Sequence, residues 1–329
     1  MSFLNLFLDL SIAKIAQDHP INYFDIGSRG GFQDDLFPLA FTVNAIGFEP
    51  EPSEFTKLTS RANGPWLTAK YLPFGISGKG GGETLFIPRD PQSASLLRHN
   101  ESLGLQFNKE QFFEVENILE IETQTLSEAF KKANVKSVDY LKIDIEGAEL
   151  AVFRSSSTLL DTVLAVKTEV SFVDFRHEQP VAFEVDQFMS EKGFILMDLV
   201  QPSYWRRQGY IIHPYTANEL PPYSKGQIMH GDYLYFRDPE TLDGEPKAYI
   251  KLALISMAFG YFDNALMILE KSIVRKYVAE RYRESVLEIV EPASIKYGRK
   301  VFWATLYSQF RGLVPLLRYS KNTIKNLAT

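Results

Sequence analysis

The chain has 329 residues, which is enough for one large domain with an appendage. Its hydrophobic content of 45% and charged content of 23% are those of a soluble globular protein, and its longest uncharged stretch, 13 residues over 36–48, is too short to span a bilayer. The absence of cysteine excludes disulfides, thiolate metal sites and cysteine nucleophiles, and the net charge of −6 argues against a nucleic-acid partner.

The first informative pattern is an apolar strand predicted over residues 21–26, followed by a turn that contains three glycines. Such glycines let the chain turn sharply and bring its backbone close to a ligand. A helix is predicted over residues 32–40 and a second strand over 43–48, which ends at Glu49, 24 residues after Asp25. This spacing is typical of a βαβ unit that binds an adenosine-bearing cofactor, with the acid on the ribose hydroxyls.

The charge of the turn indicates which cofactor it binds. The sequence there is D-x-G-x-x-G-G, whereas the dinucleotide fingerprint is G-x-G-x-x-G. Asp25 at the mouth of the turn would repel a pyrophosphate, which prefers bare amides and a helix N-terminus. The same carboxylate suits S-adenosylmethionine, whose methionine end carries a sulfonium and an ammonium. A methyl donor is therefore favoured, and a nicotinamide oxidoreductase is the weaker alternative.

Strands and helices alternate along the rest of the first two thirds of the chain. Further strands are predicted near residues 69–76, 84–88, 113–121, 138–144, 163–170, 193–199 and 232–237, and further helices over 52–61, 125–134, 147–160 and 180–192. The alternation predicts an α/β fold with a doubly wound, mostly parallel Rossmann-like sheet and helices on both faces. The glycine-rich stretch 78–82 interrupts this rhythm, so the strand after it is expected in a hairpin or at an edge.

The last part of the chain differs in pattern and in charge. A proline- and tyrosine-rich loop is expected over residues 214–222 and an acidic linker over 238–246, beyond which the pattern is helical only. We therefore predict a cofactor-binding domain over residues 1–240 and an all-helical C-terminal module over 241–329. After Glu291 there are seven cations and no acids, which leaves 28 cations against 41 acids before it, a balance of −13.

A second informative pattern is a buried strand that ends in charged residues, turns at a glycine and enters a helix. Ligands of doubly wound sheets bind at the carboxyl ends of the strands. We therefore expect Asp144 and Glu146, which follow this strand, to face the same crevice as Asp25 and Glu49. Glu149, in the first turn of the helix, could act only on the helix dipole.

Three motifs together carry a family resemblance: D-I-G-x-x-x-G from Asp25, F-E-P from Phe48, and L-K-I-D-I-E-G-A-E from Leu141. In this order they resemble the motifs of FkbM-type methyltransferases, which depend on S-adenosylmethionine, and the resemblance covers about residues 20–238. It implies O-methylation of a hydroxyl, often on a sugar or glycan-like acceptor. One departure is Ser28-Arg29-Gly30, where the family often has a smaller, neutral turn.

The expected cofactor site follows from the first two motifs and one lesser family position. Its residues are Asp25, Gly27, Ser28, Arg29, Gly31, Glu49, Pro50 and Ile76. Glu49 is expected on both ribose hydroxyls, and the turn is expected to hold the methionine end, with Arg29 near its carboxylate. The structural alternatives are that the glycines only form a tight turn and that Glu49 is a solvated strand end.

Methyl transfer to an alcohol needs a base, because an alcohol is a poor nucleophile at neutral pH. Asp144 and Glu146 are the best candidates, since two acids two residues apart on an extended segment project to the same side. The pair could instead hold a divalent metal, which no sequence pattern supports, or hydrogen-bond a sugar diol. Glu169, at the end of an apolar strand, is either catalytic or structural. His177 and His230 are expected in loops after strands, either against the acceptor or at the surface.

The basic tail leaves the partners open. It could lie on an anionic membrane as an amphipathic helix, associate with a second copy, or cover the acidic body of the domain, which we favour slightly. The expected substrate partner is a small-molecule or glycan acceptor, and the expected location is the cytoplasm or the inner face of a membrane. The alternative to an enzyme is a non-catalytic cofactor-fold scaffold that recruits a partner through its C-terminal helices.

Overall fold

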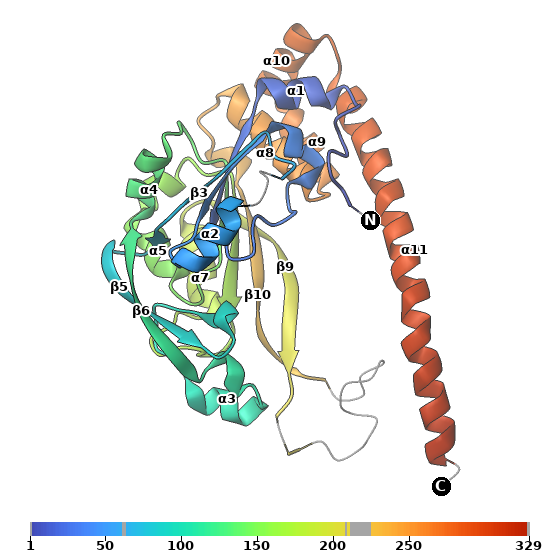
Figure 1. The fold of residues 1–329 in the computed structure, drawn as a ribbon. Coiled ribbons are helices and arrows are strands. Elements are labelled where there is room, and N and C mark those ends of the chain that lie inside the picture. Colours follow the sequence, from blue (N-terminus) through green and yellow to red (C-terminus); the bar gives the residue numbers. More distant parts are fainter. Residues whose placement is uncertain (1, 61–63, 208, 211–224, 328–329) are drawn as a thin grey trace.

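The computed structural model describes residues 2–60, 64–207, 209–210 and 225–327. Its centre is a seven-stranded sheet in the order β3-β2-β1-β7-β8-β10-β9 (Figure 1). The strands are β1 (Ile21–Ile26), β2 (Val43–Phe48), β3 (Thr68–Leu72), β7 (Tyr140–Ile143), β8 (Ala165–Ser171), β9 (Phe194–Trp205) and β10 (Gln227–Arg237). The first five are parallel, and β10 runs antiparallel to both β8 and β9. The predicted mostly parallel α/β sheet is confirmed.

The central strands β1, β2, β7 and β8 are buried on both faces, as their apolar sequences require, whereas the edge strands β3 and β9 are partly exposed. Successive side chains of a strand point to opposite faces, so Tyr23 and Phe24 belong to different hydrophobic clusters. The cluster around Phe24 is completed by α4 (Leu126–Ala133), α5 (Glu149–Ser155), α6 (Ser157–Leu160) and α7 (Ala182–Glu191). The cluster around Tyr23 is completed by α1 (Ile12–Asp18), α8 (Pro246–Ala258), α9 (Phe262–Leu269) and α10 (Ser272–Tyr282).

A smaller sheet lies beside the carboxyl ends of the central strands. It has the order β4-β6-β5, with β4 (Gly75–Ile76), β5 (Gly81–Pro88) and β6 (Val115–Gln124). β5 pairs antiparallel with β6 and forms an edge, as expected for the strand after the glycine-rich stretch. Two short helices complete the domain, α2 (Pro52–Ser60) after β2 and α3 (Glu101–Phe107) before β6.

The helix predicted over residues 32–40 is wrong. Only a short 3₁₀ helix, η1 (Phe37–Thr42), forms in this crossover. Phe32 stacks on a tyrosine ring of β3, with 4.7 Å between the ring centroids, and Asp35 accepts a hydrogen bond of 2.8 Å from Lys167 on β8. These side chains are held by separate strands of the sheet, and the tertiary contacts override the local preference for a helix.

The C-terminal helices share a core with the sheet. α8 is buried along most of its length, and its cluster also contains residues of β1, β2 and α1. The boundary between residues 240 and 241 stays a prediction, although the hydrophobic core continues across it. The loop expected over residues 214–222 lies outside the described residues.

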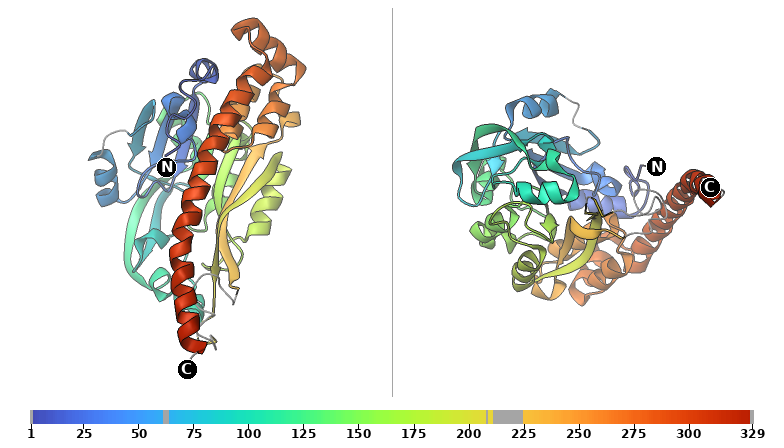
Figure 2. Two further views of the ribbon diagram at one scale, coloured as in Figure 1. Left: turned by 90° about the vertical axis from the view of Figure 1, so that its right-hand side faces the viewer. Right: turned by 90° about the horizontal axis from the view of Figure 1, so that it is seen from below.

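The last helix, α11 (Val286–Leu327), has 42 residues and leaves the body of the protein (Figure 2). Its first turns are packed, with Val286, Ile289 and Ala293 buried in the core. Beyond them the helix does not cover the acidic body, because Phe302 and Phe310 are 60% and 62% exposed. The expectation that the tail covers the body is therefore wrong. No helix within the described ranges combines the length and apolar character needed to cross a membrane.

Candidate functional site

The turns after β1 and β7 pack closely at the carboxyl ends of the strands. Gly27 has φ +82°, a conformation that glycine adopts without steric cost. Its carbonyl oxygen accepts a hydrogen bond of 3.2 Å from Lys142 Nζ, and the amide of Asp144 donates to the carbonyl of Ile26 over 3.0 Å. The motif that begins at Asp25 and the motif that begins at Leu141 therefore form one continuous surface.

A cavity opens beside these turns, and its space of about 630 Å³ includes the solvent at its mouth. It lies between the turn after β1, the end of β2 and the small sheet. Five of the eight predicted cofactor residues line it: Gly27, Arg29, Glu49, Pro50 and Ile76. We call this space the donor cavity. These five residues therefore lie around one cavity, and their contact with a cofactor stays a prediction.

Glu49 is the acid of the donor cavity. It is only 3% exposed, and its Oε1 accepts a hydrogen bond of 2.9 Å from the backbone amide of Glu51. Burial raises the pKa of Glu49 above its ordinary value, and the amide of Glu51 and the charge of Arg29 oppose that rise. Arg29 in turn lies 3.4 Å from the Glu51 carboxylate. The arrangement offers a fixed carboxylate with a cation nearby.

The other three predicted cofactor residues do not line the donor cavity. Asp25 is fully buried, and its Oδ1 lies 3.3 Å from Lys142 Nζ. Ser28 Oγ donates to the carbonyl of Asp25 and accepts from the amide of Phe48, which holds the turn against β2. Gly31 lines a separate cavity beside Phe32. These residues shape the turn, and the carboxylate of Asp25 does not stand at its mouth as the charge argument assumed.

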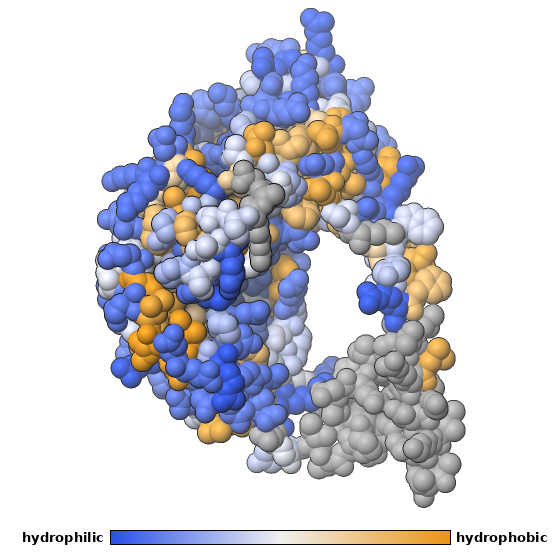
Figure 3. Space-filling view, viewed as in Figure 1, coloured by the Kyte–Doolittle hydropathy of each residue, from blue (hydrophilic) through white to orange (hydrophobic). Residues whose placement is uncertain are grey.

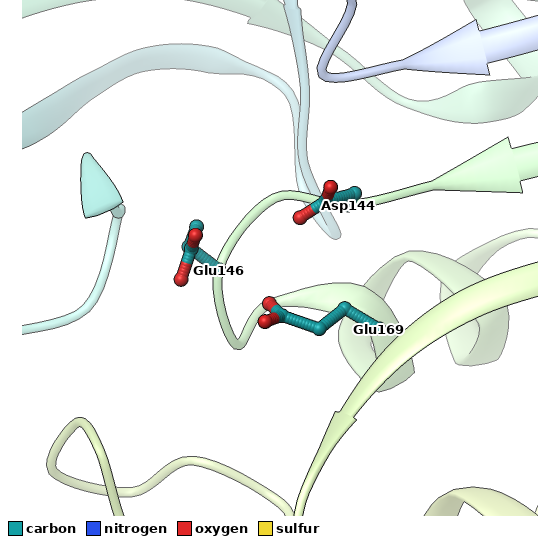
Figure 4. A group of neighbouring side chains, drawn as sticks. All are labelled: Asp144, Glu146 and Glu169. Carbon is teal, nitrogen blue, oxygen red and sulfur yellow. The ribbon is translucent and has the colours of Figure 1, made fainter. Parts of the chain in front are cut away.

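Three carboxylates converge next to the donor cavity: Asp144 and Glu146 after β7, and Glu169 on β8 (Figure 4). Each contributes an oxygen, and these oxygens all lie within 4.8 Å of one another. We call them the carboxylate triad. The sequence predicted the first two together on an extended segment, but Glu146 has φ +61°, so a left-handed turn brings it to the others.

The triad has strongly perturbed electrostatics. Burial raises the pKa of Glu146 to about 7, although the Arg176 guanidinium in contact with this carboxylate lowers it. Burial, together with the charges of Glu146 and Asp144, raises the pKa of Glu169 well above its ordinary value. Oε1 of Glu169 lies 3.0 Å from Nδ1 of His230. Three carboxylates this close do not all stay ionised, so the triad holds protons near neutral pH.

A second cavity, of about 830 Å³, lies on the other side of the turn after β7. Glu146, Glu169, Arg176 and His230 line it, together with the aromatic side chains of Phe112, Phe175 and Trp205. We call this space the acceptor cavity. Gln92 lines both cavities, and Ile145 lines the first while its neighbour Glu146 lines the second. The two cavities are therefore adjacent.

The two predicted histidines have different positions. His230 lines the acceptor cavity, and burial lowers its pKa. His177 is exposed, its backbone amide donates to the carbonyl of Arg98, and it does not line the cavity. His230 therefore lies in the acceptor cavity and His177 lies outside it, and contact of either residue with an acceptor stays a prediction.

Sequence reasoning missed three residues of the site. Lys142 lies buried between Asp25 and Asp144, at 3.3 and 3.5 Å from their carboxylates. It belongs to the third motif, but no role was predicted for it from the sequence. Arg176 directly precedes His177, which was predicted at the acceptor, and it lines the acceptor cavity. Trp205 ends β9, and no pattern in the sequence marked it.

Glu149 also has a more specific role than a dipole contact. Its carboxylate accepts hydrogen bonds from the amides of Ile145 and Gly147, at 2.9 and 3.0 Å, and so fixes the turn that carries the triad.

The triad is the acidic group within the described residues that could hold a metal ion. Carboxylate oxygens suit Mg²⁺ and similar hard cations. Two of the three carboxylates already have a partner on one oxygen, because Arg176 contacts Oε2 of Glu146 and His230 contacts Oε1 of Glu169. Oε2 of Glu169 is buried without a partner among the described residues.

Comparison with protein families gives the identity of the domain. The model of the FkbM methyltransferase domain matches residues 25–196, which is more than half of the chain. The chain belongs to the FkbM methyltransferase family. The resemblance stated from the three motifs is confirmed, and all three lie within the matched residues.

Two further comparisons add little. The fold search found the crystal structure of a Streptococcus pneumoniae protein described as a candidate tRNA (m1A22) methyltransferase, at 10% identity and a TM-score of 0.30, covering 86% of this chain and 97% of that one. A search of curated proteins found no match.

As a member of the FkbM family the chain is a methyltransferase, and the family uses a donor of the S-adenosylmethionine type.

Proposed function

We propose that this FkbM-family protein is an S-adenosylmethionine-dependent O-methyltransferase that acts on a hydroxyl of a sugar, a glycan or a similar polyol. One observation carries the proposal: the donor cavity and the acceptor cavity meet at the turn after β7, where Ile145 lines the first and Glu146 lines the second. A methyl group bound in one cavity can meet a nucleophile bound in the other across this turn.

The donor is assigned to the cavity that holds Glu49. Its buried carboxylate accepts hydrogen bonds from the two ribose hydroxyls, and Arg29 pairs with the carboxylate of the methionine end. Gly27 lets the backbone approach the ligand, because it carries no side chain there. Pro50 and Ile76 supply apolar wall for the adenine.

In the reaction, the hydroxyl oxygen of the acceptor attacks the methyl carbon in line with the bond from carbon to sulfur. A new bond forms between oxygen and carbon, the bond from carbon to sulfur breaks, and the sulfonium becomes a neutral thioether. The proton of the hydroxyl passes to a carboxylate of the triad. Glu146 is the favoured base, because a pKa of about 7 leaves it able to accept a proton at neutral pH. The charge of Asp144 raises this pKa further, and Glu169, which lines the acceptor cavity, holds a neighbouring hydroxyl.

The lining of the acceptor cavity supports a polyol. Phe175 and Trp205 offer flat apolar surfaces that fit the C–H faces of a sugar ring. The carboxylates of Glu146 and Glu169 and the guanidinium of Arg176 line the same cavity and can hydrogen-bond several hydroxyls at once. A purely apolar acceptor would leave Oε2 of Glu169 and Nε of Arg176, which have no hydrogen-bond partner within the described protein, buried and unpaired, which is costly.

The test is methyl transfer from S-adenosylmethionine with an isotopically labelled methyl group, using a carbohydrate-containing extract as acceptor and mass spectrometry as the readout. We expect the label in a methyl ether on a sugar or polyol, and its loss with the Glu146→Gln protein. Label found on nitrogen or sulfur, or no binding of the donor, would contradict the proposal, and the latter would favour the scaffold alternative.

A further inference from the structure

The projecting half of α11 carries an exposed apolar face. Phe302, Trp303, Tyr307, Phe310 and Leu317 are each between 56% and 70% exposed. Trp303, Phe310 and Leu317 follow one another at intervals of seven residues, so they lie along one side of the helix. Hydrophobic residues are visible on this part of the helix, at the right-hand edge of Figure 3, with open space between them and the body. This face has no partner within the described part of the chain.

Positive charge accompanies that face. Lys300 and Arg311 are 11 residues apart, close to three helical turns, so they lie on one side of the helix, and Tyr307 lies on that side between them. No acid occurs after Glu291. An exposed helix that carries aromatic residues and cations but no acid is typical of segments that lie in the headgroup region of a membrane.

We propose that the projecting half of α11 docks on an anionic lipid surface. Tryptophan and tyrosine favour the boundary between headgroups and acyl chains, and Trp303 and Tyr307 occupy the exposed face. Each cation near an anionic surface adds attraction. Pairing with the same helix of a second copy is disfavoured, because each helix carries cations and no acid after Glu291.

Vesicle binding by the full-length protein tests the proposal, with no donor or acceptor present. The two lipid probes are vesicles of phosphatidylcholine alone and vesicles of phosphatidylcholine with phosphatidylglycerol. We expect binding to the anionic vesicles that weakens as salt is added. The double variant Lys300→Gln/Arg311→Gln should bind them at least about tenfold more weakly.

The matched control is Lys79→Gln/Lys131→Gln. It changes the net charge by the same amount at exposed positions, after β4 and on α4, on the opposite side of the molecule from α11 (Figure 1). We expect it to bind the anionic vesicles as the wild type does. Equal loss of binding in the two double variants would overturn the assignment to α11.

The apolar face has its own readout. Trp303 is one of three tryptophans, and its emission should shift to the blue and be quenched by brominated lipid when the helix docks. In Trp303→Phe protein these changes should disappear while binding persists. The Phe302→Ser/Phe310→Ser protein should lose binding although it remains folded, because both rings lie outside the core.

Two results overturn the proposal. One is the absence of binding to anionic vesicles by folded wild-type protein. The other is a dimer in sedimentation equilibrium that Phe302→Ser/Phe310→Ser converts to a monomer, combined with vesicle binding that does not change. That result would assign the apolar face to a second copy of the chain.

Discussion

Gly27 lies so close to Asp144 that a Cβ added to the glycine would fall 1.9 Å from the aspartate's carbonyl oxygen. The turn after β1, which borders the donor cavity, and the turn after β7, which carries the triad, are thus packed backbone against backbone. No side chain can be placed between them without moving one of the two turns.

The substitution Gly27→Ala should therefore disturb both cavities. The alanine would be strained at φ +82° and would collide with backbone that cannot rotate away. Gly30→Ala is the matched control, because Gly30 has φ +84° but open space around an added Cβ. We expect the control to lose about 1–2 kcal/mol of unfolding free energy from backbone strain alone, and Gly27→Ala to lose more, together with donor binding. Equal losses, measured by urea unfolding and calorimetry, would contradict the close packing.

Lys142 should stabilise the fold by neutralising Asp25. Removing one partner of a buried ion pair typically costs about 3–5 kcal/mol, and we expect that loss for Lys142→Met. Burial raises the pKa of Asp25 to about 6, and Lys142 opposes that rise. Without the lysine, Asp25 binds a proton more readily in the folded state than in the unfolded state, so the variant gains relative stability as the pH falls.

Urea unfolding of wild type and Lys142→Met on both sides of the pKa of Asp25, about 6, measures this effect. The loss of unfolding free energy in Lys142→Met relative to wild type should be smaller below this pKa than above it. The double variant Asp25→Asn/Lys142→Met should be less destabilised than Lys142→Met at the higher pH. A deficit that does not depend on pH would mean that Lys142 acts through packing instead.

Turnover should rise with pH through the apparent pKa of the triad. Glu146 acts as a base only when deprotonated, so activity falls as the pH drops through about 7. Arg176 lowers this pKa, and replacing it by glutamine should move the rising limb of the profile of kcat against pH to higher values. Arg176→Lys, which keeps the charge, should move it less. If the rising part of the profile of kcat against pH does not move in Arg176→Gln, then Glu146 is not the group that titrates.

Chelation of divalent ions should leave turnover unchanged if the triad works as a base. The reason is that Arg176 and His230 already occupy oxygens of Glu146 and Glu169. The measurement is the initial rate with and without EDTA, followed by addition of Mg²⁺ or Mn²⁺. Activity that collapses on chelation and returns with a metal ion would replace the base mechanism by a metal-assisted one.

Much of the framework could be predicted from the sequence because it depends on local pattern. β1 and β2 have the bounds expected from their apolar runs and the glycines that follow. Asp144 and Glu146 could be assigned to the crevice because parallel strands place their carboxyl ends at one edge. Two predictions were wrong: that residues 32–40 form a helix and that Asp25 stands at the mouth of the turn. The conformation of both segments depends on partners from distant strands, which a local pattern does not show.

The same reasoning explains the residues of the site that were not found. Arg176 and Lys142 matter because of the carboxylates they meet, and those contacts exist only after folding. Trp205 reaches the acceptor cavity only because β9 joins the sheet beyond β10. The direction of α11 could not be predicted either, because an amphipathic pattern does not show which surface the apolar side of a helix contacts.

Calorimetric titration with S-adenosylmethionine tests the central claim most directly. Charged hydrogen bonds contribute about 1.5–3 kcal/mol each, so Glu49→Ala should bind the donor at least about tenfold more weakly than wild type. Glu122→Ala is the control, since Glu122 is exposed on β6 between two residues that line the donor cavity. Glu122→Ala and Glu146→Gln should both keep wild-type donor affinity. Unchanged affinity in a folded Glu49→Ala protein would contradict the account.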